Sequence, residues 1–326
     1  MATLENYKYA TLMQLTNEIT DKGNLRKIVE VLNRENAILE DAMFFEADET
    51  FSHTVYRRGS LPTPSARVLN DGVALTDSQT TPIRETIMML HDRSQIDKTI
   101  LNSSTSPKEL RSKRAMPHLE GMSQRMAYYM FYGNAATDPK VFTGLSERLD
   151  AANSDNTISS GGTSTGYLTS IYVVSWQEEQ CFMIYPRAHK GVGIEHDQFG
   201  PIELDGITSG TKFIGYSDHF SWHCGLAVAD TRCIGRLANI PTRAAATVGV
   251  FDEDDLIELT NNMKLGPQSA IYVPKRIKTI MQIAAKDKTN INYTFDEVLS
   301  GKPVMRFNGI PVKLCEAIST AETEIG

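Results

Sequence analysis

Histidine and cysteine side chains gather between positions 219 and 233, and their residue types could do chemistry. The set is His219, His223, Cys224 and Cys233. Nitrogen and sulfur atoms of this kind are the ligands that zinc prefers. The neighbouring aromatic residues indicate a strand, in which His219 and His223 share one face while Cys224 points to the other. A closed tetrahedral site would need a bulge there. Buried thiols and a strand-edge histidine are therefore the simpler interpretation, and a zinc-dependent β-rich enzyme is the alternative.

Other chemical motifs are missing from the sequence. It contains no GxSxG, GxxxxGK[ST] or HExxH pattern, and the segment Gly191-Val192-Gly193 leads into no glycine-rich turn. His189 and His196 flank that segment without a carboxylate at a recognisable spacing. The acidic run from Asp252 to Asp255 has the ligands of a divalent ion, but a solvated helix start is the simpler interpretation. We therefore expect neither an enzyme nor a cofactor.

Composition narrows the function classes further. The 326 residues are 41% hydrophobic and 22% charged, as in an ordinary folded protein with one or two compact units. A net charge of −7 argues against a protein that coats nucleic acid, because such a protein needs excess Lys and Arg to neutralise phosphates. No apolar run approaches the ~20 residues of a membrane helix. The scattered cysteines suit a reducing cytoplasm, and no membrane partner is expected.

The stretch from Leu119 to Arg148 carries the strongest structural pattern. Methionines 122, 126 and 130 follow Leu119 at steps of three and four residues, which predicts a helix with one apolar face. Gly133 and Asn134 should end this helix, since both residues adopt the left-handed conformation at low cost. A turn at 137–139 then precedes a second apolar group, formed by Val141, Phe142 and Leu145.

Upstream of this stretch the sequence predicts an arm, a hairpin and further helix. Leu25 to Met43 form an amphipathic pattern of about five turns, which would pack on its own domain or lie across another subunit. Residues 50–87 alternate like strands around a Gly- and Pro-rich tip, and predict a long hairpin. Residues 90–101 have helical spacing, and a helix start is expected at Pro107. Pro117 predicts two helical pieces or one kinked helix.

Downstream the pattern changes from loop to strand and then to mixed elements. Residues 150–167 are small and polar and predict a solvated loop. Short apolar runs between 168 and 250 predict strands. A helix is expected after Asp252, then a strand over 270–273, a turn at Pro274 and a second helix. A final strand pair should lie around 307–314.

Four stretches resemble known proteins in the same order along the chain. The first is Phe131-Tyr132-Gly133-Asn134, followed by Pro139, Phe142, Gly144, Leu145 and Arg148. The others are Ile171 to Trp176 with Tyr185-Pro186, Gly225 to Ile240, and Phe307 to Ile318. Together they are similar to a podovirus-like group of tailed-phage major capsid proteins with the Hong Kong 97-type fold.

This resemblance implies a mixed α/β fold with four parts. Residues 1–48 would be an N-terminal arm and 49–89 an extended β-hairpin loop. Residues 90–167 and 295–326 would form a peripheral domain on a central spine helix. Residues 168–294 would hold a β-rich segment and the apical domain.

The resemblance also implies a structural function. Copies of the chain would form hexamers and pentamers of an icosahedral shell that encloses double-stranded DNA, assembled in the host cytoplasm and found in the virion. Scaffolding, cement and portal proteins would be further partners. It transfers no catalytic residues and no metal or cofactor. A different phage structural part, such as a decoration or tail-tube protein, is the other alternative.

Two groups of charged residues follow as candidate sites. Asp48 and Glu49, together with Arg57 and Arg58 on the first hairpin strand, are candidates for contacts between subunits. Lys108, Arg111, Lys113 and Arg114 at the opening of a helix are candidates to face DNA. A solvated helix face is the simpler interpretation of the second group.

Overall fold

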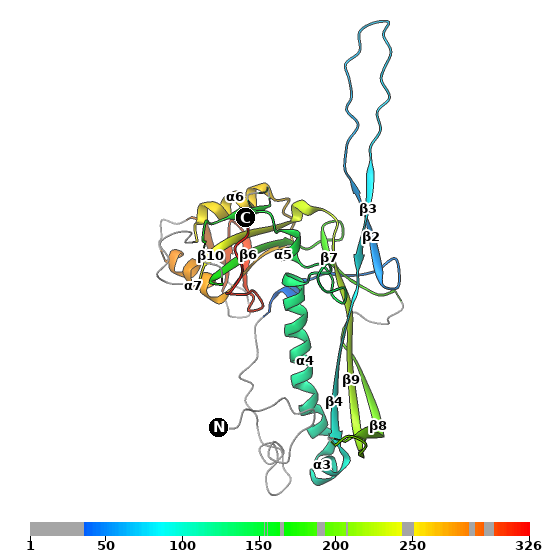
Figure 1. The fold of residues 1–326 in the computed structure, drawn as a ribbon. Coiled ribbons are helices and arrows are strands. Elements are labelled where there is room, and N and C mark those ends of the chain that lie inside the picture. Colours follow the sequence, from blue (N-terminus) through cyan, green and yellow to red (C-terminus); the bar gives the residue numbers. More distant parts are fainter. Residues whose placement is uncertain are drawn as a thin grey trace. The chain divides into compact units, whose positions relative to one another are not determined.

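The computed structural model describes residues 36–326 except 153, 155, 164–165, 188–192, 207, 243–250, 287–290 and 297–302. Helices and strands are mixed along the chain, as predicted (Figure 1). The described residues fall into two compact units. The first holds 89–126 and 193–223, and the second holds 36–88, 127–187 and 224–326, with the gaps just given. The boundary runs through helix α4 (Pro107–Tyr132) and strand β9 (Lys212–Val228).

A mixed sheet, seven-stranded within the described residues, forms the centre of the second unit. Its order is β12 (Tyr293–Asp296), β13 (Val304–Phe307), β14 (Ile310–Leu314), β11 (Ser269–Val273), β6 (Leu168–Ser175), β10 (Ile234–Pro241) and β5 (Thr157–Ser159). Strand β6 pairs antiparallel with β10 and β11, and all eight of its residues are buried. Its sequence is rich in β-branched and aromatic residues, which is typical of a strand covered on both faces.

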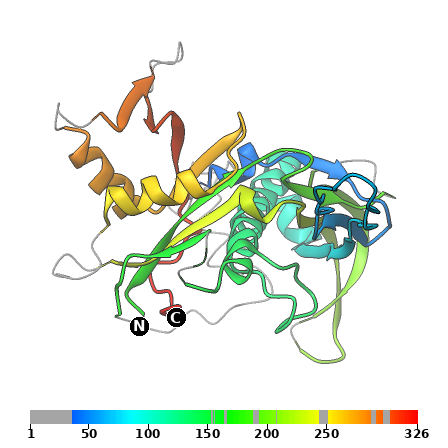
Figure 2. The same ribbon diagram turned by 90° about the horizontal axis from the view of Figure 1, so that it is seen from above.

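Helices α6 (Glu253–Asn262) and α7 (Lys275–Ala284) pack on one face of this sheet (Figure 2). Val173 of β6 shares a buried apolar cluster with Leu256 of α6 and Ile277 of α7. The Asp252 carboxylate accepts a hydrogen bond from the Asp254 N–H and so caps α6. Pro274 precedes α7 directly. The acidic run and the proline therefore predicted both helix starts correctly.

The other face of the sheet receives the end of α4 and the motif that follows it. Tyr172 of β6 lies with its ring centroid 4.9 Å from that of Phe131. Phe142 and Leu145 are also buried, and Leu145 begins the short helix α5 (Leu145–Arg148). Phe131 thus packs on the sheet, and the apolar residues of the motif that follows are buried as well.

The joint between α4 and this motif depends on two glycines. Helix α4 ends at Tyr132, directly before Gly133, as predicted. The expected reason is wrong, because neither Gly133 nor Asn134 has a positive φ. A Cβ atom at Gly133 would lie 2.3 Å from the Phe142 carbonyl oxygen, and one at Gly144 would lie 2.8 Å from the Phe131 oxygen. Glycine is required here by the close approach of two backbone segments.

The first unit is a smaller sheet with helical cover. Strand β9 pairs with β4 (Met88–Asp97) and with β8 (Glu195–Asp205), whose register runs from Asp205↔Lys212 to Glu195↔Ser221. Ile96 of β4 forms an apolar cluster with Leu101 of α3 (Lys98–Ser103) and Leu110 of α4. No helix in the described ranges is long and apolar enough to cross a lipid bilayer.

Two sequence predictions, one before α4 and one within it, are wrong in part. Residues 88–97, at the start of the predicted helical stretch, form β4, where Ser94 and Ile96 are buried and alternate with partly exposed neighbours. Pairing with β9 outweighs the helical spacing of its few apolar residues. Pro117 does not divide α4, which is one helix of 26 residues and excludes the two-piece alternative.

Two further boundaries differ from the sequence prediction. Of the predicted helix from Leu25 to Met43, the part up to residue 35 lies outside the described residues. Beyond it only α2 (Ile38–Asp41) is helical, and β1 (Phe44–Glu46) follows and pairs parallel with β7 (Cys181–Tyr185). The predicted loop over 150–167 contains β5, which gains its hydrogen bonds from β10.

Candidate functional site

The β2–β3 hairpin has a paired root and a long exposed tip. Strands β2 (Ser52–Arg58) and β3 (Thr80–Thr86) pair antiparallel from Ser52↔Thr86 to Arg58↔Thr80, as predicted. Residues 59–79 continue beyond the paired strands (Figure 1). Five large apolar side chains on this tip are 65–102% exposed: Leu61, Val68, Leu69, Val73 and Leu75. The hairpin therefore carries apolar surface that its own subunit leaves uncovered.

Arg148 fixes the hairpin root to the rest of the second unit. Its guanidinium donates to both carboxylate oxygens of Glu85 on β3, at 2.7 and 2.6 Å. Both side chains are nearly buried, with 14% and 8% of their surface exposed. The Arg148 Nε also donates to the Thr143 carbonyl oxygen at 3.2 Å. A bidentate pair of this kind sets orientation as well as distance, so the motif after α4 orients the hairpin.

Arg57 makes a second attachment on the other hairpin strand. Its Nε donates to the Ala229 carbonyl oxygen at 3.0 Å, and Nη2 donates to that of Val228 at 2.5 Å. Burial lowers the pKa of Arg57, because the charged guanidinium loses part of its hydration. The two carbonyl oxygens compensate that loss and tie β2 to the end of β9.

Acidic residues before the hairpin complete the root. Glu49 accepts hydrogen bonds from Ser52 Oγ at 2.5 Å and from Arg84 Nη2 at 2.6 Å. The Ser52 hydroxyl and the Arg84 guanidinium lower the pKa of Glu49. Asp48 Oδ2 lies 3.1 Å from His53 Nδ1. Both acidic residues that precede β2 are therefore paired within the chain.

The four predicted contact residues thus have different surroundings. Asp48, Glu49 and Arg57 are engaged inside their own subunit, while Arg58 is exposed and forms no ion pair among the described residues. A contact between subunits through any of them stays a prediction, and Arg58 is the best placed of the four. Glu85 and the apolar tip residues were not predicted from the sequence. The tip could have been recognised from the sequence, because its apolar residues stand among polar ones.

A cleft of about 820 Å³ opens at the hairpin root. Phe182 and Val55 contribute apolar surface to it, and Arg58, Glu178 and Glu179 contribute charge. Glu178 and Glu179 are exposed and form no ion pair within the described part of the chain. The cleft therefore has an apolar lining and charges of both signs that form no ion pair among the described residues. It lies beside β2, the strand that leads to the tip.

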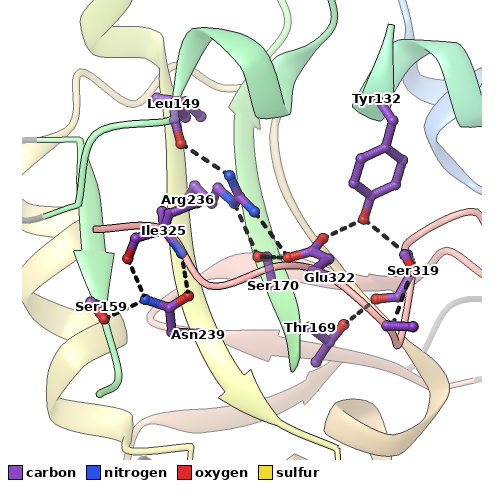
Figure 3. A network of polar contacts seen from close by, with 11 residues as sticks. Tyr132, Leu149, Ser159, Thr169, Ser170, Arg236, Asn239, Ser319, Glu322 and Ile325 are labelled. Atoms are coloured by element: carbon purple, nitrogen blue, oxygen red, sulfur yellow. Dashed lines mark hydrogen bonds and ion pairs between the residues drawn. The ribbon is translucent and has the colours of Figure 1, made fainter. Parts of the chain in front are cut away.

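A buried polar network holds the end of α4 to the sheet (Figure 3). Glu322 accepts hydrogen bonds from Tyr132 and Ser170, and from Arg236 Nη2 at 2.9 Å. Arg236 and Glu322 are only 4% and 5% exposed. Burial disfavours the charged form of Arg236, but Tyr172 and Glu322 outweigh it and raise its pKa. The tyrosine of the Phe-Tyr-Gly-Asn motif is therefore a fixed part of this network.

The same network binds the last residues of the chain. Asn239, which has a φ of +56°, donates from Nδ2 to the Ile325 carbonyl oxygen at 2.9 Å and accepts from the Ile325 N–H at 3.1 Å. Thr169 Oγ1 donates to the Ser319 carbonyl oxygen at 2.7 Å (Figure 3). The C-terminal segment is thereby anchored across β6 and β10.

The predicted basic group lies on the first turns of α4. Arg111 donates to the Asp218 carboxylate at 2.9 and 3.0 Å, and its side chain is 17% exposed. It also donates to the carbonyl oxygens of Phe199 and Ser217. Arg111 is therefore engaged inside the first unit, whereas Lys108 is exposed. A role of Lys108, Lys113 and Arg114 toward DNA stays a prediction.

The histidine and cysteine residues give the zinc alternative no support. No group of three or more His, Cys, Asp or Glu that could hold a metal ion occurs among the described residues. Burial raises the pKa of Cys224, and burial with the nearby Asp230 carboxylate raises that of Cys233 to about 12. Both thiols are buried, and they behave as small apolar residues of the core.

Comparison with known proteins identifies the family. The family model for Major capsid protein GP7 matches residues 20–326. The chain belongs to this family. The Phe-Tyr-Gly-Asn motif and the hairpin are therefore parts of a capsid subunit, and the protein is a structural component of the viral shell. No curated protein matches the chain.

Solved structures agree with this assignment. The chain is similar to a chain in the near-atomic cryo-EM structure of bacteriophage Epsilon15, with 26% sequence identity, a TM-score of 0.73 and 99% coverage of each chain. It also resembles a chain of the bacteriophage JBD30 capsid at 10% identity and a TM-score of 0.51, covering 88% of this chain and 93% of that one. The fold is the Hong Kong 97-type capsid fold expected from the sequence.

Proposed function

We propose that copies of this major capsid protein form hexamers and pentamers that close into an icosahedral shell around double-stranded DNA in the host cytoplasm. One observation carries the proposal: a hairpin whose root is locked to its own subunit while its tip exposes apolar residues. A two-stranded hairpin is marginal alone in water. A neighbouring copy is the surface that would cover the tip.

The energetics favour many shared contacts over one strong interface. Covering each large apolar side chain of the tip would contribute about 1.5–3 kcal/mol before the cost of ordering it. Part of this gain is lost to ordering the tip in one conformation. A single hairpin contact is then modest, but a closed shell repeats it at every subunit, so the contacts act together.

The charged candidates have secondary roles in this proposal. Arg58 leads from the root to the tip and would meet a carboxylate of the adjacent subunit. Lys108 would face the enclosed DNA as a diffuse positive charge, without reading its sequence. Scaffolding, cement and portal proteins would be additional partners of the assembling shell.

Substitution of the tip tests the proposal. The five apolar tip residues are changed together to Ser, and sedimentation velocity compares this variant with the unaltered chain. We expect large particles for the unaltered chain and slowly sedimenting subunits for the variant, with unchanged far-UV circular dichroism. The matched control changes Ile214 and Ile291, which are exposed apolar residues outside the hairpin and outside α6 and α7, to Ser. Assembly of the tip variant at the unaltered level would refute the role of the hairpin.

A further inference from the structure

Helices α6 and α7 carry opposite charge. The segment 252–262 contains five carboxylates and no Lys or Arg, while 275–286 contains four basic residues and no Asp or Glu. Asp254 and Glu258 are exposed and lie four residues apart, so they occupy the same face of α6. Lys275 and Lys278 lie three residues apart on α7. Each helix therefore presents a face of one sign.

These charges are not neutralised within the subunit. The side chains of Asp254, Glu258, Lys275, Arg276 and Lys278 form no ion pair among the described residues. Like charges four residues apart destabilise a helix by a few tenths of a kcal/mol. Burial raises the pKa of Asp255, and the neighbouring carboxylates raise it further. The acidic face is thus a site of repulsion that a positive partner would relieve.

The two helices cover different halves of the same sheet face. Helix α6 packs beside β10 and β5 at one end of the strand order, and α7 packs beside β14 toward the other end. Both are held firmly, because Leu256 and Leu259 of α6 and Ile277 and Met281 of α7 are completely buried. Figure 2 shows the two helices on this face. The second unit therefore has an acidic side and a basic side on rigid elements.

We infer that the acidic face of α6, with Asp254 and Glu258, docks on the basic face of α7, with Lys275 and Lys278, of a second copy of this chain. The inference rests on the proposed function, since rings of copies supply the repeated contact. An acidic surface and a basic surface on one subunit form a head-to-tail contact, which closes into a ring at the right rotation. Charge complementarity of this type selects the partner and its register.

Charge reversal provides the test. One variant carries Asp254→Lys with Glu258→Lys, and another carries Lys275→Glu with Lys278→Glu. Each variant places like charges at the contact, so the protein concentration needed for assembly should rise by roughly tenfold or more, because like-charge contacts cost several kcal/mol. Thermal unfolding followed by circular dichroism checks that each subunit is still folded.

A fourfold variant with all these changes is the matched control. Its net charge stays at −7, and its two faces are complementary again with exchanged signs. We expect it to assemble like the unaltered chain. An equimolar mixture of the two double variants should form six-membered rings without closed shells, because five members cannot alternate around a ring.

The outcomes separate this inference from the proposed function. If the unaltered chain never forms rings or shells, the proposed function fails. If it does form them and both double variants assemble equally well, the α6–α7 contact is refuted while the proposed function stands. A folded fourfold variant that stays unassembled would also refute the contact.

Discussion

Arg148 and Glu85 lie in the second unit and join the motif after α4 to the second strand of the hairpin. Two short hydrogen bonds link them, and little of either side chain reaches water. Removing one member of such a pair leaves the other charge buried without compensation. The loss is therefore larger than for an exposed ion pair, which is worth at most about 1 kcal/mol.

We predict that Arg148→Met lowers the free energy of unfolding of the second unit by about 3 kcal/mol. Arg148→Lys should recover only part of this loss, since an ammonium group does not bridge both carboxylate oxygens of Glu85. Urea unfolding measures the loss, and hydrogen exchange of residues 52–58 and 80–86 reports the hairpin root. The control is the exposed Arg58→Met, which should change stability by less than about 0.5 kcal/mol. Equal losses for Arg148→Met and Arg58→Met would contradict the prediction.

Single residues of this site could be predicted from the sequence only where a motif marked them. Arg148 belongs to the motif that follows Phe-Tyr-Gly-Asn. Arg57 and Arg58 stand at the end of an alternating strand pattern. Glu85 is one of forty acidic residues, and nothing in its neighbourhood marks it as buried. Its partner is 63 positions away, so the pair exists only because the fold brings β3 to α5.

At the scale of elements, the joint after α4 depends on backbone packing. The Gly144 N–H donates to the Gly133 carbonyl oxygen at 2.8 Å, and a Cβ atom at Gly144 would come within 2.8 Å of three backbone atoms. Backbone atoms cannot turn aside as a side chain can. The spacing of the two glycines is therefore a structural requirement of this joint.

We predict that Gly144→Ala destabilises the protein by about 2 kcal/mol, in the range found for overpacking. The matched control is Gly121→Ala inside α4, where no atom lies within 4 Å of the added Cβ. That change should stabilise by about 0.5–1 kcal/mol, because Ala favours a helix over Gly. Thermal and urea unfolding measure both variants. An unchanged free energy of unfolding for Gly144→Ala would contradict the prediction, because it would show that the backbone at this joint can shift at little cost.

Three histidines meet where β4 and β9 pair in the first unit. His91 Nδ1 lies 3.2 Å from His219 Nε2, with the rings stacked, and the His223 ring lies edge-on to His91 at 5.1 Å. Asp197 of β8 faces His219 at 3.8 Å. Burial and the neighbouring His219 lower the pKa of His91. A proton on His91 is therefore bound less tightly in the folded chain than in the unfolded one.

We predict that the first unit loses stability as the pH falls. The unfolded chain takes up the proton at the ordinary histidine pKa of about 6.5, whereas the folded chain takes it up only at lower pH. Stability is fully present above pH 6.5 and declines as the pH falls toward the lowered pKa of His91. His91→Gln should reduce this slope in urea unfolding between about pH 7.5 and about pH 5.5. An unchanged slope would contradict the assignment.

Elements with strong internal patterns could be predicted, and those shaped by a neighbour could not. Strand β6 and helices α6 and α7 follow from apolar runs, caps and a proline. Strand β8, with most of its residues exposed, shows no alternation and is a strand because β9 pairs with it. The misread stretch over 88–97 has the same cause. Pairing between distant segments is invisible in a local pattern.

At the scale of the whole molecule, the subunit combines a rigid sheet with surfaces that it leaves open. The core of the second unit fixes the two charged helices, while Arg57 and Arg148 hold the hairpin root. The apolar side chains of the tip over 59–79 are exposed, and Asp254 and Glu258 of α6 and Lys275 and Lys278 of α7 form no ion pair among the described residues. Such surfaces are expected of a subunit whose final environment is other subunits.

Cryo-electron microscopy of particles formed by the purified chain would show directly whether the hairpin tip is covered by an adjacent subunit. We predict closed shells built of hexamers and pentamers, in which density for residues 59–79 of each subunit lies against an adjacent subunit and covers Leu61, Leu69 and Leu75. Shells whose hairpin tips project freely into solvent, or a chain that remains a folded monomer under all assembly conditions, would contradict it.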